Sequence, residues 1–138
     1  MFKTYVNEPF LIEPLLRNHL QQNQGKLLYV VFWATWADQC LTEMPYTKDL
    51  YFEFTDKGAA FAHICLESAE RQWKTVFDKY EPGGQYYLLS NQQSAEIRKR
   101  YGIKSFPFYV LIDKNGNVKE KGCHLKPLIA RDKIKGIL

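Results

Sequence analysis

A run of seven apolar or aromatic residues, Leu27 to Trp33 (LLYVVFW), constrains the fold of this chain more than any other feature. A strand with one face in water alternates apolar and polar residues, whereas this run is uninterrupted. Its β-branched and aromatic side chains predict a central strand that is covered on both faces. Helices are therefore expected on both sides of the sheet to which this strand belongs.

The segments around this strand alternate between helical and extended patterns. The expected elements are, in chain order, an edge strand over 2–6, a helix over 13–22, the strand over 27–33, a helix over 38–57, a strand over 60–66, a helix over 69–80, a strand over 86–89, a helix over 92–101, two strands over 108–112 and 118–121, and a helix over 128–134. This order predicts one α/β domain over 1–138, with a central mixed sheet, helices on both faces and a C-terminal β-hairpin plus helix.

Three single residues predict local features of these helices. Pro45 lacks the backbone N–H of a regular helix and is expected to kink the helix over 38–57. Ser68 is expected to cap the helix that follows it, because a serine side chain accepts hydrogen bonds from the first turn. Gly102 is expected to end the helix over 92–101 in a left-handed conformation.

Composition excludes several classes of function. The 138 residues carry a formal net charge of +4, and the basic residues are scattered, so no nucleic-acid surface is expected. No segment has the length of a membrane span, and residues 1–10 lack the apolar run of a secretory signal. These observations leave the compartment and the oligomeric state undecided.

The cysteines and histidines predict neither a disulfide framework nor a metal site. Cys40, Cys65 and Cys123 are odd in number and widely spaced, which fits no zinc pattern, and the three histidines do not complete one. No metal and no other cofactor is expected. Cys65 lies within an apolar strand and is expected in the core.

The segment at the carboxyl end of the central strand carries the strongest functional signal. Residues 32–40 (FWATWADQC) resemble the FWAxWCxxC motif of the thioredoxin superfamily, and residues 40–45 (CLTEMP) resemble the TlpA/ResA-type thiol-disulfide oxidoreductases. YLLS at 87–90, YGIKSFPFYVLIDKNGNV at 101–118, and Gly122 extend the resemblance in family order. The resemblance implies a thioredoxin-like fold.

The resemblance also implies roles for the two ends of the motif. In the family a nucleophilic cysteine stands at the start of a helix, and a second cysteine one turn inside resolves the mixed disulfide. Here Ala37 occupies the first position and Cys40 the second. Because Ala37 has no sulfur, ordinary dithiol exchange at this motif is excluded. The reactivity of Cys40 stays open, since burial raises a thiol pKa and a helix start lowers it.

Further site residues follow from the same resemblance. Glu43 lies beside Cys40 on the helix, where the family uses a glutamate to move protons, although a solvated charge is the simpler interpretation. Phe106 and Pro107 match the cis-proline loop that pairs with an extended substrate. Trp36 is expected at the rim of the site, in contact with that substrate.

One further sulfur is left without an assigned role. Cys123 follows Gly122 where the family's hairpin approaches the rim of the site. A disulfide needs Cα atoms within about 7 Å, so participation of Cys123 together with Cys40 stays open.

Three functions agree with these residues. The first is a TlpA/ResA-type oxidoreductase acting on protein or peptide thiols and disulfides, with a degenerate AxxC motif in which dithiol exchange is lost or limited to one thiol. The second is a non-catalytic module that binds polypeptide by strand pairing at the cis-proline loop. The third is a peroxiredoxin-like one-cysteine peroxidase built on Cys40 and Glu43. If the chain is excised from a longer TlpA-like precursor, a periplasmic or other extracytoplasmic location is expected.

Overall fold

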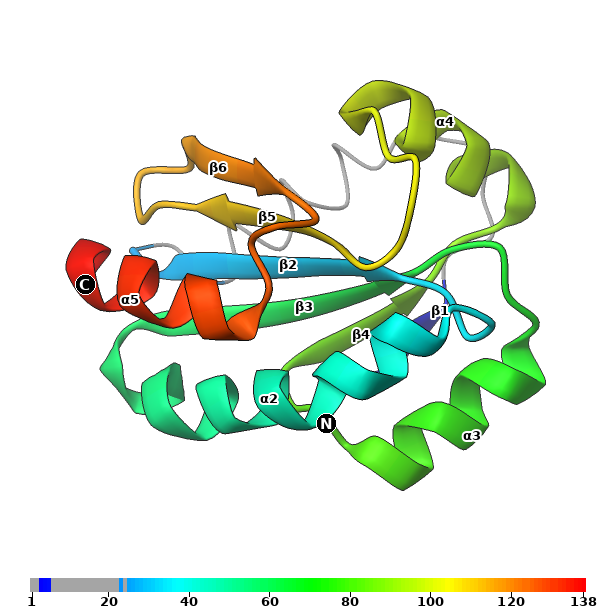
Figure 1. The fold of residues 1–138 in the computed structure, drawn as a ribbon, viewed down its shortest axis with the longest axis horizontal. Helices are drawn as coiled ribbons and strands as arrows, with labels where there is room; N and C mark the ends of the chain where they lie inside the picture. The colour runs from blue at the N-terminus through cyan, green and yellow to red at the C-terminus, as the bar shows by residue number, and fades with distance from the viewer. Residues whose placement is uncertain (1–2, 6–22, 24) are drawn as a thin grey trace.

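A mixed six-stranded sheet forms the centre of the molecule (Figure 1), in a computed structural model that describes residues 3–5, 23 and 25–138. The strands are β1 (Lys3–Tyr5), β2 (Leu27–Trp33), β3 (Ala59–Cys65), β4 (Gln85–Leu88), β5 (Phe108–Ile112) and β6 (Val118–Gly122). Their spatial order is β1-β4-β3-β2-β5-β6. Strands β1 to β4 pair in parallel, whereas β5 pairs antiparallel with β2 and with β6. The structure confirms the predicted mixed sheet and its C-terminal hairpin.

The helices cover both faces of this sheet, as predicted (Figure 1). They are α2 (Asp38–Phe54), α3 (Glu70–Tyr80), α4 (Asn91–Tyr101) and α5 (Pro127–Ile137), with a short 3-10 helix, η1 (Thr55–Lys57), after α2. Phe77 of α3 stacks on Tyr86 of β4 with ring centroids 3.9 Å apart, on the face that α2 and α5 also cover. Tyr101 of α4 contacts Phe32 of β2 on the opposite face. The helix expected over 13–22 lies outside the described residues.

The central strand β2 is buried along its whole length, which confirms the first expectation from the sequence. It pairs with β3 on one side and with β5 on the other. Burial of an aliphatic or aromatic side chain contributes about 1.5 to 3 kcal/mol of stability, so this run is a main source of folding free energy. Its carboxyl end leads directly into the loop before α2.

The predicted capping role of Ser68 is wrong. The residue before α3 is Ala69, which makes no side-chain capping hydrogen bond. The Ser68 hydroxyl instead donates to the Leu66 carbonyl at 2.9 Å and accepts from the Thr35 backbone N–H at 3.0 Å. This hydroxyl therefore ties the loop after β3 to the loop after β2.

The structure also bears on the expectations for Gly102 at the end of α4 and for Pro45 in α2. Helix α4 ends at Gly102 with φ of 66°, which confirms the left-handed C-cap. Helix α2 continues through Pro45 to Phe54. The kink expected at Pro45 stays a prediction.

A buried histidine in β3 makes the stability of the fold sensitive to acid. His63 is fully buried, and its ring nitrogens have no hydrogen-bond partner within the described part of the chain. Burial lowers its pKa to about 4. Protonation therefore favours the unfolded chain, in which a histidine pKa is about 6.5.

Acid is expected to remove up to about 3 kcal/mol of the free energy of unfolding through His63 as the pH falls from about 6.5 to about 4. This contribution is fully present above pH 6.5, where the histidine is neutral in both states. Urea unfolding at several pH values would measure the loss. In the variant His63→Leu, the free energy of unfolding should lose the pH dependence due to the histidine and keep only that due to the carboxylates. An unchanged slope in the variant would contradict the assignment.

Candidate functional site

The loop between β2 and α2 places Ala37 at the start of α2. Ala37 is the N-cap residue, with extended backbone angles (φ −95°, ψ 102°), and no side chain caps the helix. Its carbonyl oxygen accepts a hydrogen bond of 2.9 Å from the Cys40 N–H. The first backbone amides of α2 therefore face a half-buried methyl group. A helix start of this kind stabilises a negative charge, but Ala37 has no ionisable group.

The structure shows the environment of Cys40, on which the reactivity of this thiol depends. Its side chain is buried, with 2% of its surface exposed. Burial raises the pKa of this thiol to about 12, and hydrogen bonding from the Ala34 backbone lowers it only in part. Cys40 is therefore a protonated and sheltered thiol near neutral pH.

Glu43 lies one turn after Cys40 on α2 and is partly buried. Its carboxylate accepts a hydrogen bond of 3.0 Å from the Gln39 side chain. Burial raises the pKa of Tyr109 strongly, and the charge of Glu43 raises it further. Glu43 therefore lies one turn from Cys40 on α2, and its role in proton transfer stays a prediction.

The cis-proline loop lies against the loop before α2. The peptide bond between Phe106 and Pro107 is cis, as the motif predicts. The Phe106 ring makes an edge contact with Trp36, with centroids 5.8 Å apart. Trp36 is 58% exposed, and its indole N–H donates to the Glu67 carbonyl at 3.0 Å. The structure therefore brings Trp36, Phe106 and Pro107 together at the carboxyl end of β2.

Arg98 of α4 is a supporting residue that the sequence analysis misses. Its guanidinium lies over the Phe106 ring, 5.0 Å from the centroid, and contacts both carboxylate oxygens of Glu67 at 3.0 and 2.7 Å. It also donates to the carbonyls of Ile103 and Lys104 at 3.2 Å. Arg98 thus holds the cis-proline loop against the loop after β3. Its position in a basic cluster resembles an ordinary solvated surface, so no local pattern marks this role.

The remaining cysteines differ sharply in environment. Cys65 is fully buried in β3, as predicted. Cys123 is exposed, and its sulfur lies 3.4 Å from the Ser105 hydroxyl and 3.6 Å from the Ser105 carbonyl oxygen. All three thiols are free. Over the described ranges, no cluster of three or more His, Cys, Asp or Glu side chains is arranged to hold a metal ion.

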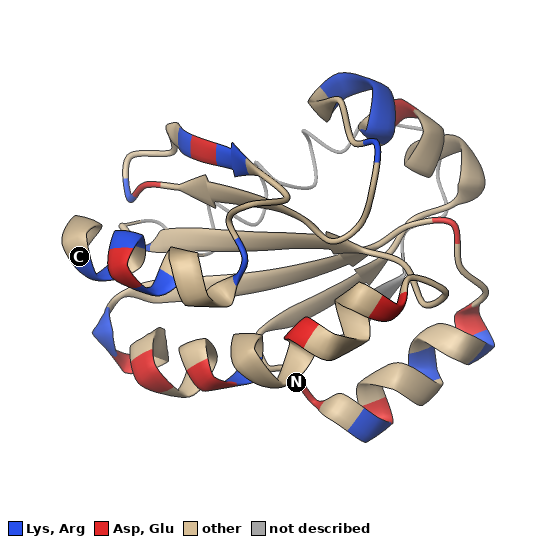
Figure 2. Cartoon of the chain, in the orientation of Figure 1, with Lys and Arg blue, Asp and Glu red and all other residues tan. Residues whose placement is uncertain are grey.

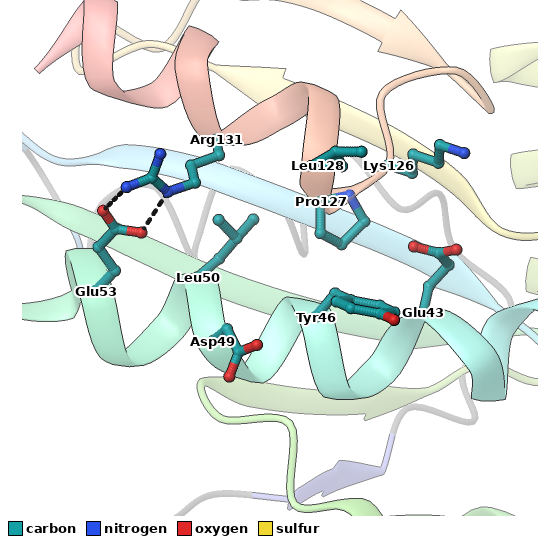
Figure 3. Close-up of a pocket in the computed structure, with 9 residues that line it drawn as sticks. All are labelled: Glu43, Tyr46, Asp49, Leu50, Glu53, Lys126, Pro127, Leu128 and Arg131. Atoms are coloured by element: carbon teal, nitrogen blue, oxygen red, sulfur yellow. Dashed lines mark hydrogen bonds and ion pairs between the residues drawn. The ribbon is translucent and has the colours of Figure 1, made fainter.

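A groove separates α2 from the start of α5 (Figure 3). Its volume is about 450 Å³, and it is lined by Glu43, Tyr46, Asp49, Leu50, Glu53, Lys126, Pro127, Leu128 and Arg131. Arg131 closes one end by donating to both carboxylate oxygens of Glu53 at 2.8 and 2.7 Å. Glu43 lies at the other end, toward the start of α2. The groove therefore ends beside the candidate site.

Charged residues of both signs lie on the surface of the molecule. Acidic and basic residues are interspersed along α3, β6 and α5 (Figure 2). Among the helices of the described chain, none is long and apolar enough to cross a membrane.

Comparisons with known proteins converge on one family. A Redoxin family profile matches residues 16–132. The chain is 29% identical to the thiol-disulfide oxidoreductase ResA of Oceanobacillus iheyensis over 119 residues, which cover 86% of this chain and 59% of that protein. It is 30% identical to ResA of Bacillus thuringiensis over 99 residues, which cover 72% of this chain and 56% of that protein. The chain thus spans less than two thirds of these relatives.

A solved structure shows the same fold. The thioredoxin domain of a thiol-disulfide oxidoreductase from Bacteroides vulgatus superposes with a TM-score of 0.78 at 25% identity. The match covers 86% of this chain and 84% of that domain. The predicted thioredoxin-like fold is therefore confirmed.

Proposed function

Because the chain belongs to the Redoxin family, we propose that it is a ResA/TlpA-type thiol-disulfide oxidoreductase domain that has lost dithiol exchange within its AxxC motif. The polypeptide-binding surface beside the motif is retained. The proposal depends on two facts about the motif. Ala37 places a methyl group at the start of α2, and Cys40, one turn further along the helix, has a buried thiol.

Disulfide exchange requires a thiolate that reaches the substrate sulfur. Ala37 stands where the helix start would stabilise such a thiolate, but it supplies no sulfur. Cys40 has a sulfur, but burial keeps it protonated and away from solvent. Neither position of the motif can therefore begin the exchange.

The retained surface suits an extended polypeptide that carries a thiol or a disulfide. The backbone before Pro107 can pair with a strand, as in other modes of strand addition. The exposed Trp36 ring packs on the buried Phe106 ring and forms an aromatic rim beside it, and aromatic side chains contribute strongly to peptide contacts. Arg98 and Glu67 hold this rim in place through the contacts described above.

The environment of Cys40 argues against one of the two alternative functions and leaves the other open. A non-catalytic binding module uses the same aromatic rim and agrees with the loss of a nucleophile at Ala37. A one-cysteine peroxidase needs an accessible thiolate, and the burial and raised pKa of Cys40 argue against it. For a chain that is part of a longer precursor, we propose an extracytoplasmic location, which the likeness to TlpA/ResA-type proteins implies.

Replacing Trp36 with alanine is expected to weaken peptide binding about tenfold, which corresponds to about 1.4 kcal/mol. The ring supplies exposed aromatic area next to Phe106, and alanine removes it. Isothermal titration calorimetry would measure the affinity for an extended peptide in which serine replaces the substrate cysteine, so that no exchange occurs.

The control variant is Phe52→Ala. Phe52 is 67% exposed and lies near the C-terminal end of α2, away from the cis-proline loop. Its removal should leave the affinity unchanged. If both variants lose affinity equally, or if Trp36→Ala binds like the parent chain, the peptide does not dock at this rim.

A further inference from the structure

The groove between α2 and the start of α5 has two walls of opposite charge (Figure 3). The wall formed by α2 carries three carboxylates, those of Glu43, Asp49 and Glu53. The wall formed by α5 and the residue that precedes it carries two cations, Lys126 and Arg131. Each wall is therefore complementary in charge to the other kind of wall.

These charges are only partly neutralised within one copy of the chain. Glu53 and Arg131 pair with each other at one end of the groove. Glu43 accepts a hydrogen bond from a neutral amide side chain and keeps its charge. Asp49 and Lys126 are exposed, and neither forms an ion pair among the residues that the structure describes. The α2 wall thus keeps negative charge, and the α5 wall keeps positive charge.

Apolar side chains lie between the charged ones. Leu50 and Pro127 are buried and line the inner part of the groove. Tyr46 on the α2 wall is 57% exposed, and Leu128 on the α5 wall is 75% exposed. Two large exposed side chains on facing walls provide apolar area that a partner can cover, and the charges around them form a polar rim.

A second copy of the chain presents both kinds of wall at once. In a dimer with two-fold symmetry, the same surface of each copy meets its counterpart. If the two-fold axis runs along the groove, α2 of one copy lies against α5 of the other, and acidic walls meet basic walls. If the axis crosses the groove instead, each wall meets its own kind, and like charges repel. The charge pattern therefore favours the first arrangement.

We propose that the chain self-associates through this groove, as a dimer whose two-fold axis runs along it. Lys126 of one copy lies against the wall that carries Glu43 and Asp49 in the other copy. Tyr46 and Leu128 of each copy cover the groove of the other. One groove per copy is a small contact, so a reversible dimer with a Kd of about 10 µM to 1 mM is expected. The groove does not include the cis-proline loop, so the dimer does not rest on the proposed function.

Sedimentation velocity of the parent chain from about 10 µM to about 1 mM tests whether it dimerises. The monomer should convert to a dimer within this range. Addition of about 0.5 M NaCl should weaken the association, because salt screens exposed charges. A parent chain that stays monomeric throughout the range would overturn the proposal.

Charge reversal of one wall at a time tests which surfaces meet. Glu43→Lys/Asp49→Lys makes both walls basic, and Lys126→Glu makes both walls acidic. Each variant alone should self-associate at least about tenfold more weakly than the parent chain. An equimolar mixture of the two should form a heterodimer at least as tight as the parent dimer, because each acidic wall then meets a basic one. A mixture that stays monomeric would contradict the two-fold arrangement.

Two control variants separate the groove from the rest of the surface. Lys114→Glu makes the same charge change as Lys126→Glu, but in the exposed turn between β5 and β6, and should dimerise as the parent chain does. Leu128→Ala should weaken the dimer, whereas Phe52→Ala, which removes an exposed ring of α2 outside the groove lining, should not. Equal losses for Lys114→Glu and Lys126→Glu would show that net charge, rather than this groove, governs association. Circular dichroism would establish that each variant is folded.

Discussion

Replacing Ala37 with cysteine is expected to increase the rate of insulin reduction by dithiothreitol at least about tenfold over the chain as given. The new thiol would stand at the N-cap of α2, where no side chain competes for the first backbone amides. These amides and the helix dipole lower a thiol pKa, and Cys40 one turn inside can resolve the mixed disulfide. The substitution adds one sulfur atom at a half-buried position.

Two variants separate this explanation from a general effect of substitution. Ala37→Ser is close in size to Ala37→Cys but has no thiol, so it should remain at the rate of the parent chain. The double variant Ala37→Cys/Cys40→Ala should lose most of the gain, because the mixed disulfide cannot be resolved within the motif. Equal rates for the parent chain and Ala37→Cys would show that residue 37 is not the missing nucleophile.

Gly84→Ala is expected to lower the free energy of unfolding by about 3 kcal/mol or more. Gly84 has φ of +94°, which an L residue rarely adopts. A Cβ atom there would also lie 2.4 Å from the Phe61 carbonyl oxygen and 2.8 Å from the Phe61 Cβ. Because the obstructing atoms belong to the neighbouring strand β3, β4 would have to move away from it. Urea unfolding would measure the loss.

Gly116→Ala is the matched control for this prediction. Gly116 also has a positive φ, +87°, but a Cβ atom there would meet nothing within 4 Å. Its cost is therefore limited to backbone strain, about 1 to 2 kcal/mol. The difference between the two variants isolates the clash with β3. Equal losses would mean that β4 adapts to the extra methyl group.

The strands were predictable because each is marked by its own residues. The apolar run over 27–33 fixes β2 by itself, and the turn residues 113–117 separate β5 from β6. Helix starts were less predictable, and Ser68 shows the reason. A serine before a helix resembles a cap, but here its hydroxyl is engaged by Thr35, 33 residues earlier in the chain. A contact of that range leaves no mark in the local pattern.

The same distinction between local patterns and long-range contacts applies to the residues of the candidate site. The positions of Ala37 and Cys40 at the start of a helix followed from a contiguous motif. The support of the rim by Arg98 did not, because its partner Glu67 lies 31 residues away. Tyr109 lies within an apolar strand and resembles ordinary core. Only the three-dimensional structure reveals that its buried hydroxyl has no hydrogen-bond partner among the described residues.

Alkylation of Cys40 in the folded chain distinguishes a sheltered thiol from a reactive one. Iodoacetamide would be applied from about pH 6 to about pH 9, and the modification of each cysteine would be read by mass spectrometry. We predict that Cys123 reacts while Cys40 stays unmodified until the chain is denatured. Rapid modification of Cys40 in the folded chain, with a midpoint near or below neutral pH, would show that the motif retains an accessible nucleophile and would contradict the account.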